Sequence, residues 1–145
     1  MNLDRLTTPF WSLRVVLGAA AFLAGLDKFF NLLADWPAYL SPLAANLLPI
    51  SSSSFMHVVG LVEMAVGVTI LAGFTQLGGY AAAAWLICIA LNLVTTGHYL
   101  DVAVRDIAMA VAAFTLARLT EAGVVPAHAS ARSATHIDNI RTITA

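Results

Sequence analysis

Residues 79–96 read GYAAAAWLICIALNLVTT, an apolar run without a charged side chain. An α-helix needs about 20 mostly apolar residues to cross the hydrocarbon core of a membrane. Three more stretches of similar character lie at about residues 13–33, 55–74 and 102–119. Short connections at residues 75–78 and 97–101 favour antiparallel packing of the helices that they join. The sequence therefore predicts an all-α fold, an integral membrane four-helix bundle over residues 13–119.

The composition agrees with a chain that lies in lipid. Of its 145 residues, 60% are hydrophobic and 10% are charged, and the mean hydropathy is +0.85. A soluble domain has about 25% charged residues. The net charge of −1 gives no electrostatic basis for binding nucleic acid. The single cysteine, Cys88, cannot form an internal disulfide, so any redox role requires a bound cofactor or a partner.

The basic residues predict the orientation of the chain. The long connection at residues 34–54 has no lysine or arginine, and its prolines argue against a continuous helix. Positive charge gathers instead before or at the start of the first predicted helix and at or after the end of the fourth, at Arg5, Arg14, Arg118, Arg132 and Arg141. Because basic residues favour the cytoplasmic side, we expect both termini there. Residues 1–12 then form a cytoplasmic N-terminal segment and residues 120–145 a polar cytoplasmic tail.

Charged residues within the predicted spans are the informative ones, because a charge inside a membrane is costly. They are Asp27, Lys28, Glu63, Arg105 and Asp106. The alternating helix directions place all of them in the outer half of the bilayer, which suggests one polar pocket between the helices. Glu63 is the deepest, and we expect Arg105 to pair with it, because a guanidinium suits a buried carboxylate. Asp27 or Asp106 is then left to pair with Lys28.

Two interpretations of these charges stay open. In the first, they are structural ion pairs that lock the bundle. In the second, Glu63, Arg105 and His57 surround the head group of a quinone, in an apolar slot beside Phe55, Met56 and Trp85. His57 and His98 also suit a purely interfacial position. The scattered spacing of histidines and carboxylates predicts no metal site. The glycines at 18, 25, 60 and 67 predict close packing between helices.

Several of these residues resemble motifs of the DoxX/DoxX-like family of small four-helix bacterial membrane proteins. The first stretch carries Arg14-Val-Val-Leu-Gly18, then Phe22, Gly25 and Lys28-Phe29; the second carries Gly60-Leu-Val-Glu63, then Gly67, Leu71, Gly73 and Thr75; the fourth carries Arg105-Asp106 and ends in Leu116-Ala117. The resemblance covers about residues 13–119 and implies a multi-pass protein of the bacterial cytoplasmic membrane. The broader superfamily includes redox proteins with cysteine pairs, and this chain lacks such a pair.

The resemblance implies a small subunit linked with quinol oxidation, sulfur-compound oxidation to quinone, or oxidative-stress complexes. We therefore expect an accessory or structural subunit of a larger respiratory or photosynthetic electron-transfer complex, without intrinsic catalytic activity. The alternative is a quinone- or quinol-binding component of a membrane oxidoreductase. A small-molecule carrier is less favoured, because four helices without signs of inverted repeats are unusual for one. A homo-oligomer is compatible with each hypothesis.

Overall fold

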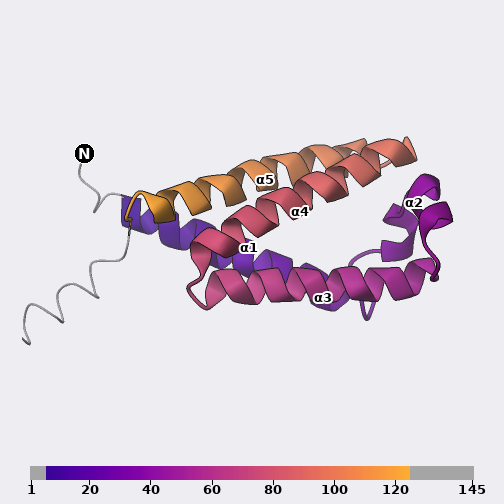
Figure 1. Cartoon of the computed structure of the whole chain (residues 1–145), viewed down its shortest axis with the longest axis horizontal. Helices are drawn as coiled ribbons and strands as arrows, with labels where there is room; N and C mark the ends of the chain where they lie inside the picture. The colour runs from indigo at the N-terminus through magenta and orange to yellow at the C-terminus, as the bar shows by residue number, and fades with distance from the viewer. Residues whose placement is uncertain (1–5, 125–145) are drawn as a thin grey trace, which may run out of the picture.

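The computed structural model describes residues 6–124, and within this range the chain is helical, with no strand. The four long helices are α1 (Thr7–Asp27), α3 (Ser52–Leu71), α4 (Thr75–Thr96) and α5 (Leu100–Glu121). Between α1 and α3 lie a short 3-10 helix, η2 (Trp36–Tyr39), and one short α-helix, α2 (Pro42–Leu47) (Figure 1). The first residues of the predicted N-terminal segment and most of the predicted tail, with Arg5, Arg132 and Arg141, lie outside the described residues.

Three of the long helices, α1, α3 and α4, are long and apolar enough to cross a membrane. Helix α5 is as long as α4, at 22 residues, but is more polar. Its charged residues fall near its two ends: Asp101, Arg105, Asp106, Arg118 and Glu121. The all-α class predicted from the sequence is therefore confirmed for the described part of the chain.

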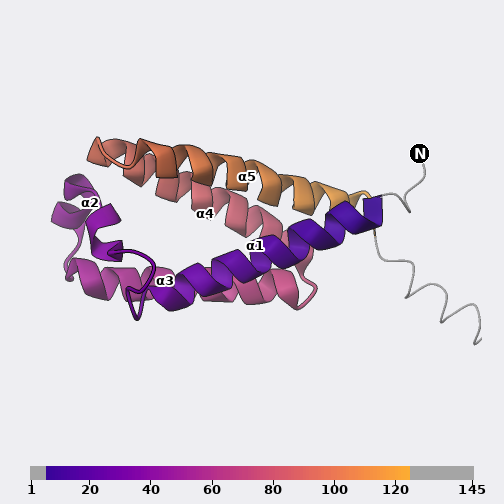
Figure 2. The same ribbon diagram turned by 180° about the vertical axis from the view of Figure 1, so that it is seen from behind.

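The long helices pack as two pairs, α1 against α3 and α4 against α5. Both views of the ribbon show that the pairs converge near the start of α1 and separate toward the end where η2 and α2 lie (Figures 1 and 2). At the converging end, apolar residues of all four long helices form the main buried cluster, which includes Phe10, Leu17, Ile70, Ala82, Ala113 and Leu116. This apolar contact joins the pairs at one end and leaves them apart at the other.

Glycines bring α1 and α3 close together, as predicted. A Cβ built on Gly25 would lie 2.5 Å from the carbonyl oxygen of Gly60, and one on Gly67 would lie 2.7 Å from that of Gly18. These distances leave no room for a side chain, so the two backbones touch at two levels. The predicted packing role of these four glycines is confirmed.

The predicted helix boundaries need correction, most of all for the first helix. It ends at Asp27 and not near residue 33, because the Asp27 carboxylate accepts hydrogen bonds from the backbone N–H groups of Leu32 (3.1 Å) and Leu33 (3.0 Å). These bonds hold the chain in a turn that a continuing helix does not allow. The ranges predicted at residues 55–74, 79–96 and 102–119 differ by a few residues from α3, α4 and α5. Gly73, with a φ of +109°, stops α3 before residue 74.

Candidate functional site

A cavity of about 650 Å³ lies between the two helix pairs, on the side where they separate. Most of its wall is apolar, with Leu17, Ala20, Ala21, Ala24, Met56, Val59, Leu86, Ile89 and Met109 among its residues. Its polar side chains come from every long helix: Lys28 from the end of α1, Glu63 from α3, Asn92 from α4, and Arg105 and Asp106 from α5. A concave, mainly apolar space with a few polar groups has the usual form of a small-molecule site.

The Lys28–Glu63 ion pair lies in the cavity wall. Lys28 Nζ donates to Glu63 Oε2 at 2.6 Å, and the two side chains are only 5% and 9% exposed. The ammonium group also lies 3.7 Å from the centre of the Trp36 ring, close enough for a cation–π interaction. The positive charge of Lys28 is therefore matched by a carboxylate and covered by an aromatic face.

This pairing corrects the prediction that Arg105 would pair with Glu63. Side chains on a helix lean toward its N-terminus, so those of the antiparallel α1 and α3 lean in opposite directions along the helix axes. The glycine contact then decides the partner, because a Cβ on Gly60 would lie 3.2 Å from Lys28 Cβ and one on Gly25 would lie 3.0 Å from Glu63 Cβ. Lys28 is thus the nearest cation to Glu63.

Arg105 pairs instead with its neighbour in the sequence. Its Nε and Nη2 donate to Asp106 Oδ1 at 3.2 Å and 3.1 Å. The Arg105 side chain is 61% exposed, whereas that of Asp106 is 6% exposed. Both residues line the cavity, but only the Asp106 carboxylate is buried there. Asp106 is therefore engaged by Arg105, and Lys28 by Glu63.

Asp27 does not pair with Lys28, which was one of the alternatives expected from the sequence. In addition to ending α1, its carboxylate accepts a hydrogen bond from Trp36 Nε1 at 2.8 Å. This bond fixes the indole of η2 over Lys28. Asp27 thus acts as a structural residue that places Trp36 at the cavity.

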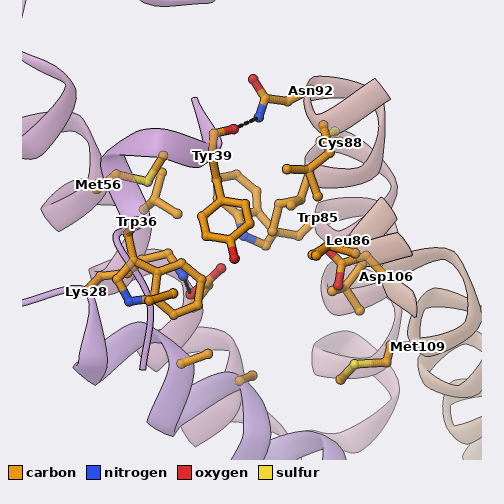
Figure 3. A pocket seen from close by; sticks show the side chains of 18 of the residues that line it. Lys28, Trp36, Tyr39, Met56, Trp85, Leu86, Cys88, Asn92, Asp106 and Met109 are labelled. Carbon is orange, nitrogen blue, oxygen red and sulfur yellow. Dashed lines mark hydrogen bonds and ion pairs between the residues drawn. The ribbon is translucent and has the colours of Figure 1, made fainter. Parts of the chain in front are cut away.

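An amide clamp holds the connection between α1 and α3 in place. Asn92 Nδ2 donates to the carbonyl oxygen of Tyr39 at 2.7 Å, and Asn92 Oδ1 accepts from the backbone N–H of Ser41 at 3.1 Å. One side chain of α4 therefore binds the backbone on both sides of Leu40. The Tyr39 ring packs at a tilt of 42° against Tyr99, with 4.5 Å between the ring centres, and projects toward the middle of the cavity between Trp36 and Trp85 (Figure 3).

The histidines do not join this arrangement. His57 is exposed and lies parallel to the ring of Phe29, with 5.0 Å between the ring centres, and it is not part of the cavity wall. Of the three residues predicted to surround a quinone head group, Glu63 and Arg105 line the cavity and His57 does not; Lys28 and Asp106 line it as well, and Arg105 is at its exposed edge. His98 is also exposed. Among residues 6–124, no three histidine, cysteine or carboxylate side chains come together as a metal site.

Comparison with protein-family models, curated proteins and solved structures finds no match for this chain.

Sequence reasoning undervalued Trp36, Tyr39 and Asn92, which surround the cavity from η2 and α4. Nothing in the sequence of residues 34–54 indicates that this connection folds back between the helix pairs and brings Trp36 and Tyr39 to the cavity. A signal for Asn92 existed, because an amide in an otherwise apolar helix needs hydrogen-bond partners. Its partners are backbone groups, which sequence does not identify.

Proposed function

We propose that this chain is a four-span membrane protein that binds a lipophilic, uncharged molecule of the quinone class in the cavity between its helix pairs. Both termini lie in the cytoplasm in this proposal, and α5 spans beside α4. A 22-residue helix is about 33 Å long at 1.5 Å per residue, against about 30 Å for the hydrocarbon core. Arg14 and Arg118, near the converging end of the pairs, favour the cytoplasm for that end.

The observation that carries the proposal is a large apolar cavity whose charged groups neutralise one another. Lys28 pairs with Glu63, and Arg105 pairs with Asp106. A ligand with a charged head would introduce an unpaired charge into this space, which is strongly unfavourable. A quinone ring is uncharged, planar and able to accept hydrogen bonds, and its apolar tail suits the alanine- and leucine-lined part of α1.

The aromatic residues support the same class of ligand. Trp36, Tyr39 and Trp85 border the cavity from three directions, as the close-up shows (Figure 3). Aromatic rings pack favourably against a flat ring in offset or edge-to-face arrangements. A cavity of about 650 Å³ also falls in the ordinary range for small-molecule sites, about 300–1,000 Å³.

A retention experiment in lipid nanodiscs tests the proposal. Discs with the protein, discs with a variant and empty discs are equilibrated with decylubiquinone, and the bound quinone is measured by absorbance. The Ala24→Phe variant places a ring into the cavity wall of α1, whereas Ala84→Phe adds the same ring at an exposed position of α4 outside the cavity. We expect retention above the lipid background for the wild type and Ala84→Phe, and background retention for Ala24→Phe. Equal retention by wild-type and empty discs would refute the proposal.

We further propose that the protein works as an accessory subunit of a larger membrane electron-transfer complex. The supporting observation is its single cysteine, which cannot form an internal dithiol pair, so electrons for a bound quinone come from a bound cofactor or from another component, and the proposal takes the second course. Purification from native membranes in a gentle detergent, followed by mass spectrometry, tests this role. Co-purification of subunits that carry redox cofactors supports it, and a stable isolated protein that carries quinone contradicts it. A small-molecule carrier would instead show quinone-independent solute uptake in liposomes.

A further inference from the structure

Tyr39 has a ring that the protein holds in place from several sides. The ring packs against a small buried cluster of α4 and α5, formed by Ala90, Leu93 and Ala103. The ring of Tyr99 lies against it with 4.5 Å between the centres, and that of Trp36 with 5.8 Å. Asn92 binds the backbone carbonyl of Tyr39 at 2.7 Å. The fold itself therefore positions both the backbone and the ring of Tyr39.

The hydroxyl group on this fixed ring points into the cavity. The close-up shows it directed toward the middle of the space between the helix pairs (Figure 3). Within residues 6–124 it makes no hydrogen bond, and protein atoms do not cover it completely. The hydroxyl group of Tyr80 differs, because it donates to Glu121 at 2.8 Å. A ligand in the cavity can therefore reach the Tyr39 hydroxyl group.

The charged groups of the cavity wall are already engaged with one another. Lys28 pairs with Glu63, and Arg105 pairs with Asp106. The amide of Asn92 uses both of its ends on the backbone of the connection. The phenol, in contrast, carries no charge and is left to bind a ligand. It suits an uncharged oxygen on that ligand, since a hydroxyl group forms hydrogen bonds with neutral partners at little desolvation cost.

We infer that the Tyr39 hydroxyl group forms a hydrogen bond with a ring oxygen of the bound quinone and also with that of its reduced form, the quinol. This inference rests on the proposed function and names the residue that binds the head group. A phenol hydroxyl group both donates and accepts hydrogen bonds. It therefore donates to a quinone carbonyl and accepts from a quinol hydroxyl, so the same residue holds the ligand in both redox states.

Three ligands and two substitutions separate this hydrogen bond from an effect of shape. Decylubiquinone, decylubiquinol and decylbenzene all carry a ring and a decyl chain, but only the first two have ring oxygens. Tyr39→Phe removes the hydroxyl group and keeps the ring. Tyr99→Phe makes the same change in the neighbouring ring, which is not part of the cavity wall. Binding of each ligand is measured in nanodiscs relative to empty discs, without oxygen so that the quinol stays reduced.

We expect Tyr39→Phe to weaken the binding of decylubiquinone and of decylubiquinol about three- to tenfold each, the effect of one hydrogen bond. Binding of decylbenzene should change by less than about twofold, and Tyr99→Phe should leave all three ligands unaffected. Equal weakening of all three ligands by Tyr39→Phe, or weakening of only one redox form, would overturn the inference. So would unchanged binding of the quinone. Each of these results leaves the proposed function standing, whereas failure of the wild type to retain quinone overturns the proposed function itself.

A measurement on the wild-type protein covers the case in which Tyr39→Phe does not fold. The chain has three tyrosines, and an isotope label at their Cζ atoms gives magnetic resonance signals that respond to hydrogen bonding of the hydroxyl group. The signals of Tyr80 and Tyr99 are assigned with the Tyr80→Phe and Tyr99→Phe variants, and the remaining one belongs to Tyr39. This signal should move on addition of decylubiquinone and stay in place with decylbenzene. A Tyr39 signal that is the same with both ligands contradicts the inference.

Discussion

Removal of one partner of the Lys28–Glu63 pair should destabilise the protein far more than removal of both. At 2.6 Å, opposite unit charges attract by about 6 kcal/mol at an effective dielectric constant of about 20. Burial of each ion costs several kcal/mol, so the pair itself contributes little net stability. If one partner is lost, however, the other remains buried and uncompensated, since both side chains are less than one-tenth exposed.

We therefore expect Lys28→Met and Glu63→Met each to lower the free energy of unfolding by about 3–5 kcal/mol. The double variant Lys28→Met/Glu63→Met replaces the pair by two apolar side chains of suitable length, and we expect its stability to lie within about 1–2 kcal/mol of the wild type. The coupling between the two substitutions should thus be large. Arg118→Gln is the control, because it removes a cation from an ion pair with Glu121 whose side chains are 62% and 28% exposed, so no buried charge is left behind.

The assay is reversible unfolding in mixed detergent micelles at increasing fractions of dodecyl sulfate, followed by circular dichroism. Free energies from the four proteins complete a double-mutant cycle. If each single variant loses less than about 1 kcal/mol and the double variant loses their sum, Lys28 and Glu63 do not form a buried pair, and the account of the cavity wall is wrong.

Three more outcomes follow from contacts elsewhere in the fold. Gly25→Ala should lower the free energy of unfolding by about 1–3 kcal/mol, because the new Cβ meets the backbone of Gly60. Gly18→Ala should lower it by less, because the nearest atoms to its new Cβ belong to the Leu71 side chain, which can move. Unfolding in detergent compares the two variants. Asn92→Leu removes both bonds of the amide clamp, so chymotrypsin should cut within η2 and α2 faster than in wild type; an unchanged cleavage rate contradicts the clamp. Arg105→Gln should lower the melting temperature, because it leaves the Asp106 carboxylate, 6% exposed, without the cation that donates to it; an unchanged melting temperature would mean that this pair contributes nothing to stability.

The helices and the glycine contact were accessible to sequence reasoning because both are local patterns. Length and apolar character identify the long helices. The seven-residue spacing of Gly18 and Gly25 in α1, and of Gly60 and Gly67 in α3, places each pair on one face. Two such faces in neighbouring antiparallel helices suggest direct backbone contact. These features need no knowledge of distant parts of the chain.

The partners of the charged residues were not accessible in this way. The choice between Lys28 and Arg105 as the partner of Glu63 depends on which helix packs against α3 and on how the side chains lean. Sequence reasoning weighed the chemistry of the two cations, which favours a guanidinium. In the structure Lys28 is the partner, because α1 contacts α3 through glycines, whereas α5 packs mainly on α4. The glycine faces contained the missing information, since Lys28 lies three positions after Gly25 and Glu63 lies three positions after Gly60.

The end of α1 illustrates why fold and site are inseparable in this chain. Asp27 and Lys28 are adjacent but have different roles. The Asp27 carboxylate holds the turn that ends α1 and binds the indole of Trp36. The Lys28 ammonium group pairs with Glu63 and lies against the face of that same indole. The turn also returns η2 and α2 to the gap between the helix pairs, where Asn92 binds them. A longer first helix, as the hydrophobic pattern alone suggests, would leave Lys28 without its aromatic cover and the cavity without one wall. The early stop of α1 is therefore the structural event on which the proposed binding site depends.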